Sequence, residues 1–257
     1  MARRKSPYDG KVIYISGASS GIGASLAKEL ARRGARVGLL ARREDRLESL
    51  AGEITAAGRT AAWAAADVCD DQGLVRALEA LKEELGPPDV VVANAGTNRP
   101  ETPKNFQPGN AIRLYDINLL GTIRLIDWAL PGFLERGSGQ IVGISSLASY
   151  VGLPANAAYS GSKAAMRIHL QSLRASLKSR GIAVTAICPG FVKSELTDRM
   201  KFPMPFLWDT ERATRYIAAA MERRRGEVAF PWQMVLFLGF LARLPAFLTD
   251  RILGRMA

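Results

Sequence analysis

Two side chains with acid–base chemistry lie one helical turn apart in the second half of the chain. Tyr159 is followed four positions later by Lys163, a spacing that none of the other five tyrosines has to a lysine. Residues four apart share one face of a helix. A phenol exchanges protons near neutral pH only if its pKa falls below about 10, and a neighbouring ammonium favours the phenolate. The pair therefore predicts proton transfer to or from a substrate oxygen.

A glycine-rich turn, residues 16–23, joins a predicted strand to a predicted helix. Gly17, Gly21 and Gly23 permit a tight turn and close packing of helix on sheet, and the N–H groups that begin the helix offer an anion site. We expect Ser19, Ser20 and Ile22 to contact a dinucleotide together with these glycines. A plain glycine turn is the alternative, and the spacing is not that of a nucleoside triphosphatase loop.

The end of the second predicted strand favours NADP(H) over NAD(H). Ala41, Arg42 and Arg43 stand there, where a free ribose 2′-hydroxyl needs an acidic partner. A 2′-phosphate needs a guanidinium fork, which Arg42 can supply, and Ser19 can add a hydroxyl. The alternative is that both arginines begin a solvated helix.

Short apolar runs alternate with amphipathic runs along the chain, and this pattern predicts the strands and helices that position these groups. Strands apolar throughout and separated by helices predict a parallel sheet covered on both faces, and hence a doubly wound α/β Rossmann fold. We expect one domain over 1–257. Strands are predicted at 12–16, 36–40, 60–66, 89–93, 140–145 and 183–187, and helices at 23–33, 44–56, 72–85, 111–130 and 157–180.

Composition excludes several classes of protein. With 257 residues, 48% of them hydrophobic and 23% charged, the chain is a folded globular protein. Two cysteines cannot build a disulfide framework and a single histidine cannot build the common multi-histidine sites, so we expect no metal and a cytoplasmic setting. The net charge of +11 fits a solvated basic surface, a phosphate ligand, an anionic membrane or a nucleic acid. The sequence shows no nucleic-acid motif, and we expect no such partner.

Several motifs in a fixed order resemble the short-chain dehydrogenase/reductase (SDR) family over residues 10–194. They are the glycine turn at 16–23, Asp67-Val68, Asn94-Ala95-Gly96, Asn118, Ser146, Tyr159-Ser160-Gly161-Ser162-Lys163 and Pro189-Gly190. The resemblance implies an oxidoreductase with a nicotinamide cofactor, commonly assembled as a homo-oligomer, a dimer or tetramer.

The resemblance also implies four catalytic roles. Tyr159 is the acid–base, and Lys163 holds the nicotinamide ribose and lowers the phenol pKa. Ser146 orients and polarises the carbonyl; Ser145 is the competitor, but strand alternation turns it to the other face. Asn118 anchors a water relay to Lys163, with a packing or helix-kink asparagine as the alternative.

Further cofactor contacts follow from the same resemblance. Asp67 accepts from the adenine amino group and the Val68 N–H meets the ring, unless Asp67 is a helix cap, a role that Asp70 or Asp71 can take instead. The other contacts lie in two loops, formed by Asn94, Ala95 and Gly96 after the fourth predicted strand and by Pro189, Gly190, Val192 and Ser194 after the sixth.

Three segments flank this framework. Residues 1–10 form a basic arm, and 195–226 form a substrate-capping segment whose apolar part, 200–208, predicts an apolar substrate, with core packing as the alternative. Residues 227–257 form an apolar and basic tail. Its charge-free stretch, 228–242, reaches about 22 Å as a helix against about 30 Å for a bilayer core, so it should not span. An anionic membrane surface, a subunit interface and an internal core remain open for the tail.

Together these features predict an NADP(H)-dependent enzyme that moves hydride between the nicotinamide and a ketone or secondary alcohol, with an apolar or lipid-like substrate. It is expected to be cytoplasmic and peripheral to the membrane if the tail binds there. One alternative is a 3-oxoacyl thioester reductase whose acidic carrier is drawn to the basic surface. Another is a non-catalytic NADP(H) sensor on the same fold.

Overall fold

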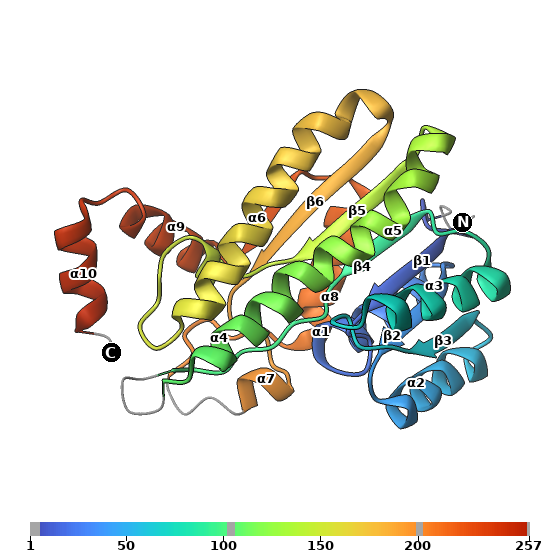
Figure 1. Ribbon diagram of the computed structural model, residues 1–257, viewed down its shortest axis with the longest axis horizontal. Coiled ribbons are helices and arrows are strands. Elements are labelled where there is room, and N and C mark those ends of the chain that lie inside the picture. The colour runs from blue at the N-terminus through green and yellow to red at the C-terminus, as the bar shows by residue number, and fades with distance from the viewer. Residues whose placement is uncertain (1–5, 102–105, 199–202, 256–257) are drawn as a thin grey trace, which may run out of the picture.

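One parallel sheet organises the molecule (Figure 1). The computed structural model describes residues 6–101, 106–198 and 203–255. Within these residues the sheet has seven strands in the order β3-β2-β1-β4-β5-β6-β7, and every pair is parallel. The doubly wound Rossmann fold is thereby confirmed. The strands are β1 (Val12–Ser16), β2 (Arg36–Ala41), β3 (Ala61–Ala65), β4 (Val90–Ala93), β5 (Gly139–Ile144), β6 (Ile182–Pro189) and β7 (Glu227–Phe230).

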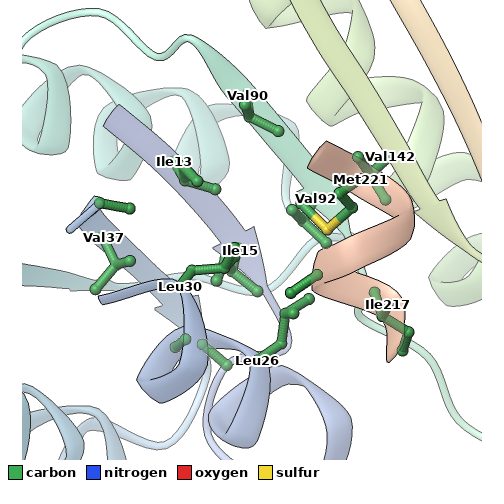
Figure 2. Packing of buried hydrophobic residues seen from close by; sticks show 14 of the residues in the cluster. Ile13, Ile15, Leu26, Leu30, Val37, Val90, Val92, Val142, Ile217 and Met221 are labelled. Carbon is green, nitrogen blue, oxygen red and sulfur yellow. The ribbon is translucent and has the colours of Figure 1, made fainter. Parts of the chain in front are cut away.

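Helices cover both faces of this sheet, as its wholly apolar strands require. Apolar side chains of α1 (Gly21–Arg32), α2 (Glu44–Ala56) and α8 (Thr210–Glu222) form one core layer. Those of α3 (Asp71–Leu85), α5 (Gly121–Arg136) and α6 (Ala157–Leu177) form the other. Figure 2 shows Leu26 and Leu30 of α1 beside Ile15, with Ile217 and Met221 of α8 in the same cluster.

A long helical run crosses the second face in three parts. It consists of α4 (Pro108–Tyr115), a π-helical turn η1 (Asp116–Leu120) and α5. This confirms the helix predicted at 111–130 and extends it at both ends. By length and composition Pro108–Arg136 is the one described helix that could cross a membrane. It packs against α6, β4 and β5, so we interpret it as a helix of the core.

The C-terminal region differs from the prediction at two boundaries. Residues 227–230 are β7, paired with β6, and Val228 and Phe230 are buried. The tail therefore begins at Pro231 instead of residue 227, and the core alternative holds for its first strand. Helix α8 packs against α1, so residues 210–222 of the predicted capping segment contribute side chains to the core.

Two short helices complete the chain and one short arm begins it. Helices α9 (Trp232–Leu241) and α10 (Ala246–Gly254) stand at one end of the molecule (Figure 1). The described part of the N-terminal arm, residues 6–10, packs on the domain, where the buried Tyr8 hydroxyl donates to Gln140 Oε1 at 3.2 Å. Residues 1–5 of the arm lie outside the described residues.

Candidate active site

The first turns of α6 place the proposed acid–base pair. Lys163 is only 4% exposed, and its Nζ donates to the carbonyl oxygen of Ile144, the last residue of β5, at 2.8 Å. Burial disfavours the ammonium and lowers the pKa of Lys163 to about 8. The lysine is thus fixed against the strand that ends just before Ser146.

The Tyr159 phenol lies close enough to the Ser146 side chain for the serine hydroxyl to influence its pKa. Burial raises the pKa of Tyr159 above its usual value, and the Ser146 hydroxyl lowers it in part. That Lys163 lowers this pKa stays a prediction.

The two neighbouring serines have separate contacts. Ser146 begins the short 3₁₀ turn η2 (Leu147–Ser149), where its Oγ accepts from the Ala148 N–H at 3.1 Å. The Ser145 Oγ instead donates to the Lys163 carbonyl oxygen at 2.9 Å and is buried. Ser145 therefore ties the strand end to α6, and Ser146 is the serine beside the phenol.

Asn118 lies fully buried in the π-helical turn η1. Its Oδ1 accepts from the Thr97 N–H at 2.8 Å, and its Nδ2 donates to the Ser162 Oγ at 3.0 Å. A Cβ added at Gly96 would lie 3.3 Å from Asn118 Oδ1 and 3.2 Å from Lys163 Nζ. The asparagine thus combines the predicted helix distortion with a place beside the lysine, and π-helical turns often occur at functional sites.

The glycine turn is held in shape from the neighbouring strand. Asn94, just after β4, donates from Nδ2 to the carbonyl oxygens of Ser16 and Gly17 at 3.1 and 3.0 Å. Gly17 has φ +66°, and a Cβ there would lie 2.7 Å from the Cα of Ala95. A Cβ at Gly23 would meet the Gly17 carbonyl oxygen. These positions leave room only for glycine, as expected where backbone closely approaches a pyrophosphate.

Arg43, not Arg42, reaches the hydroxyls of the glycine turn. Its Nη2 donates to the Ser19 and Ser20 Oγ atoms at 3.0 and 2.7 Å, and its Nη1 donates to Glu195 Oε2 at 3.0 Å. The Arg43 side chain, at the start of α2, is 42% exposed. In the described chain Ser20 precedes α1 without a side-chain hydrogen bond to the helix. The first N–H groups of α1 and this guanidinium therefore form one cationic corner.

A cleft of about 490 Å³ lies beside Arg42 and Asp67. Arg42 Nη1 is 3.6 Å from Asp67 Oδ2, while Asp67 Oδ1 accepts from the Cys69 N–H. Asp70 is the cap of α3 and accepts from the Gly73 N–H, which leaves Asp67 out of that role, as the alternative anticipated. Arg76 also lines the cleft.

The predicted cofactor loop after β6 contacts β7 at one end and approaches the glycine turn at the other. The Gly190 N–H, just after β6, donates to the Phe230 carbonyl oxygen at 2.7 Å. Farther along, Ser194 Cβ would lie 3.1 Å from a Cβ at Gly21. Val192 is buried and forms an isolated parallel β-bridge with Trp208. Val68, also buried, lies against Gly121 at the start of α5.

The predicted apolar cap divides into packed and exposed parts. Trp208 stacks on Phe230 with ring centroids 4.7 Å apart, which is the core-packing alternative. Phe206 and Leu207 are 52% and 43% exposed. The cap begins with the short helix α7 (Glu195–Asp198), and residues 199–202, which include the start of the apolar part, lie outside the described residues.

Sequence reasoning missed three residues that the structure brings to this region. Ser162 accepts from Asn118, Glu195 accepts from Arg43, and Arg76 lines the cleft. Ser162 lies on the buried side of α6, but its partner Asn118 comes from a distant segment. Nothing in the local sequence pairs Glu195 with Arg43, which lies 152 positions earlier.

The chain is similar in sequence and fold to known proteins. The family model for short chain dehydrogenase matches residues 11–202. An uncharacterized oxidoreductase of Myxococcus xanthus is 41% identical over 247 residues, covering 96% of this chain and 97% of the relative. The ketoacyl reductase HetN of a Nostoc species is 33% identical over 183 residues, covering 71% of this chain and 64% of HetN.

A solved structure agrees with the fold. A gluconate 5-dehydrogenase from Burkholderia cenocepacia, in complex with NADP and tartrate, superimposes with a TM-score of 0.79 at 25% identity. The match covers 88% of this chain and 96% of the dehydrogenase. Family model, full-length relative and sheet topology agree, and the chain belongs to the short-chain dehydrogenase family of oxidoreductases.

Proposed function

We propose that this oxidoreductase reduces ketones with NADPH, and oxidises the corresponding secondary alcohols in reverse. The observation that supports this best is the Tyr159 phenol beside the Ser146 hydroxyl, with the buried Lys163 one helical turn farther along α6. Two hydroxyls converging on one point suit a carbonyl oxygen that gains negative charge.

The choice of NADPH rests on Arg43. Its guanidinium is held by Ser19 and Ser20 at the start of α1 and faces a carboxylate, Glu195, at 3.0 Å. A ribose 2′-phosphate is an anion of the kind that this guanidinium binds. NADPH bound along the glycine turn would supply the hydride.

The residues of the chain account for the proton. Ser146 and Tyr159 donate hydrogen bonds to the carbonyl oxygen, and Tyr159 releases its Oη proton as charge develops there. The raised pKa of Tyr159 keeps the phenol protonated at neutral pH, which is the form that reduction requires. Lys163, with its pKa near 8, and Asn118 beside it position the ribose hydroxyls and return a proton to the phenol.

An apolar carbonyl compound is the substrate we favour, because exposed Phe206 and Leu207 lie in the segment that follows the cofactor loop. A second candidate, reduction of a 3-oxoacyl thioester, is supported by the relative named ketoacyl reductase. The alternative of a sensor is disfavoured because Ser146, Tyr159 and Lys163 are all present, and a sensor has no need to retain all three.

A substrate panel tests the proposal. Long-chain ketones, steroid-like ketones and 3-oxoacyl thioesters are each mixed with enzyme and NADPH, and the loss of the reduced-nicotinamide absorbance is followed. We expect turnover with at least one apolar ketone, and faster turnover of the thioester would favour the second candidate. Absence of turnover across the panel with either cofactor would refute the proposed reaction.

We also propose a cytoplasmic homo-oligomer. The helical run α4–η1–α5 presents exposed apolar side chains, which include Ile112 at 71% and Leu134 at 44%. Light scattering of the purified protein tests the assembly, and Ile112→Glu is expected to lower the oligomer mass.

A further inference from the structure

We propose that helices α9 and α10 form a docking surface for an anionic lipid membrane. We call residues 232–255 the C-terminal platform. This surface is independent of the proposed reaction, because none of its residues belongs to the candidate active site.

The platform carries an unusual amount of exposed apolar surface. On α9, Trp232, Leu236 and Phe240 lie four residues apart on one stripe and are 67%, 64% and 61% exposed. On α10, Phe247 is 70% exposed. Large exposed apolar patches on folded proteins mark surfaces that meet a partner or a membrane. Aromatic side chains are favoured at the membrane interface.

The inner side of the same helices is anchored to the domain. Leu238, Leu241 and Leu253 are buried against Leu147 and Cys188. The exposed stripe therefore does not arise from a frayed end, because the opposite side of each helix is packed. Figure 1 shows both helices standing together at the end of the molecule beyond α6.

Charge favours a lipid surface as the occupant. Residues 231–255 contain Arg243, Arg251 and Arg255 and a single acid, Asp250. On α10, Arg251 and Arg255 follow Phe247 at intervals of four, so apolar and basic groups share one helix face. Such a face places rings among the acyl chains and guanidinium groups at the lipid phosphates. If a second copy of the chain docked here through its own platform, three arginines and one acid would face the same set, so the electrostatic complementarity would be poor.

Length excludes a spanning role for the platform. Helix α9 has 10 residues and α10 has 9, against about 20 for a helix that crosses a bilayer. Both helices would lie along the surface of the membrane. The turn that follows Ser146 packs under α9 through Leu147, so the docked membrane would lie beside the candidate active site.

Vesicle flotation of the full-length protein tests the proposal. Wild type is expected to float with vesicles of phosphatidylcholine and phosphatidylglycerol, and less with phosphatidylcholine alone. Phe240→Ser with Phe247→Ser is expected to weaken binding about a hundredfold, from about tenfold for each aromatic side chain withdrawn from lipid. Arg251→Glu with Arg255→Glu is expected to weaken it by at least about twentyfold, from about fivefold for each arginine.

Matched controls separate lipid binding from unfolding and from general charge. Arg59→Glu with Arg180→Glu makes the same change in net charge at exposed positions outside the platform and should leave flotation unchanged. Melting curves check that each variant is folded. Failure of wild type to float, or flotation of the double serine variant like wild type, would overturn the proposal. If the wild type does not float and the double serine variant forms a smaller oligomer than the wild type, the platform is instead an interface with a second copy of the chain.

Discussion

Replacing Arg43 by glutamine isolates the group that we assign to the 2′-phosphate. The guanidinium is already aligned by Ser19 and Ser20, so a phosphate gains charge-assisted hydrogen bonds with little ordering. Hydrogen bonds to charged groups contribute about 1.5–3 kcal/mol. Because the side chain is 42% exposed and a phosphate must displace Glu195, we take the lower half of that range. About 2 kcal/mol corresponds to about thirtyfold weaker binding of NADPH.

Fluorescence titration of NADPH and NADH measures this effect without a substrate. Arg43→Gln should weaken NADPH about thirtyfold and leave NADH binding unchanged, and Arg59→Gln serves as the charge control. Glu195→Gln should act in the opposite direction, since it removes the carboxylate that competes for the guanidinium. An exposed ion pair is worth up to about 1 kcal/mol, so NADPH should bind up to about fivefold tighter. Equal weakening of both cofactors by Arg43→Gln would refute the assignment.

Three other predictions concern the lysine, the glycine turn and the catalytic pH. Lys163→Met should abolish turnover and also stabilise the fold at pH 7. The pKa of Lys163 is lower in the folded protein than in the unfolded chain, so between pH 8 and 10.5 the folded protein binds fewer protons than the unfolded chain. The free energy of unfolding of the wild type therefore rises with pH across this window. In urea unfolding, the difference in this free energy between the variant and the wild type should shrink there by up to about 3 kcal/mol. A difference that does not change with pH would contradict this prediction. Gly23→Ala places a methyl group on the Gly17 carbonyl and should abolish binding of both cofactors, as calorimetry can show; retained binding would contradict the close approach. Ketone reduction should be flat through neutral pH and fall in alkali as Lys163 and Tyr159 lose protons, and a rate that rises with pH would count against a protonated phenol as the acid.

Most of the fold could be predicted because its signals are local. Each of the first six strands is a short apolar run beside a glycine or polar turn, and the 3.6-residue period located each large helix of the two core layers up to residue 180. The seventh strand could not be separated from the apolar stretch that contains it. Residues 227–230 and α9 are apolar in succession, and apolar periodicity alone does not distinguish a short buried strand from a buried helix.

The candidate site was predictable where one segment defines it and not where two must meet. The spacing of Tyr159 and Lys163 on one helix face and the strand–turn–helix context of Gly17 and Gly23 are local features. Which arginine reaches Ser19 depends on how α2 begins relative to α1, and the structure selects Arg43. The direction of the Tyr159 pKa depends on burial, which no spacing encodes.

The most direct test of the central claim compares wild type with Tyr159→Phe, using NADPH and an apolar ketone that wild type reduces. Phenylalanine keeps the ring and removes the proton that we assign to the carbonyl oxygen. We predict that kcat falls by about a hundredfold or more, the range of general acid catalysis, while titration gives the same NADPH affinity. A variant that reduces the ketone at the wild-type rate would contradict the account.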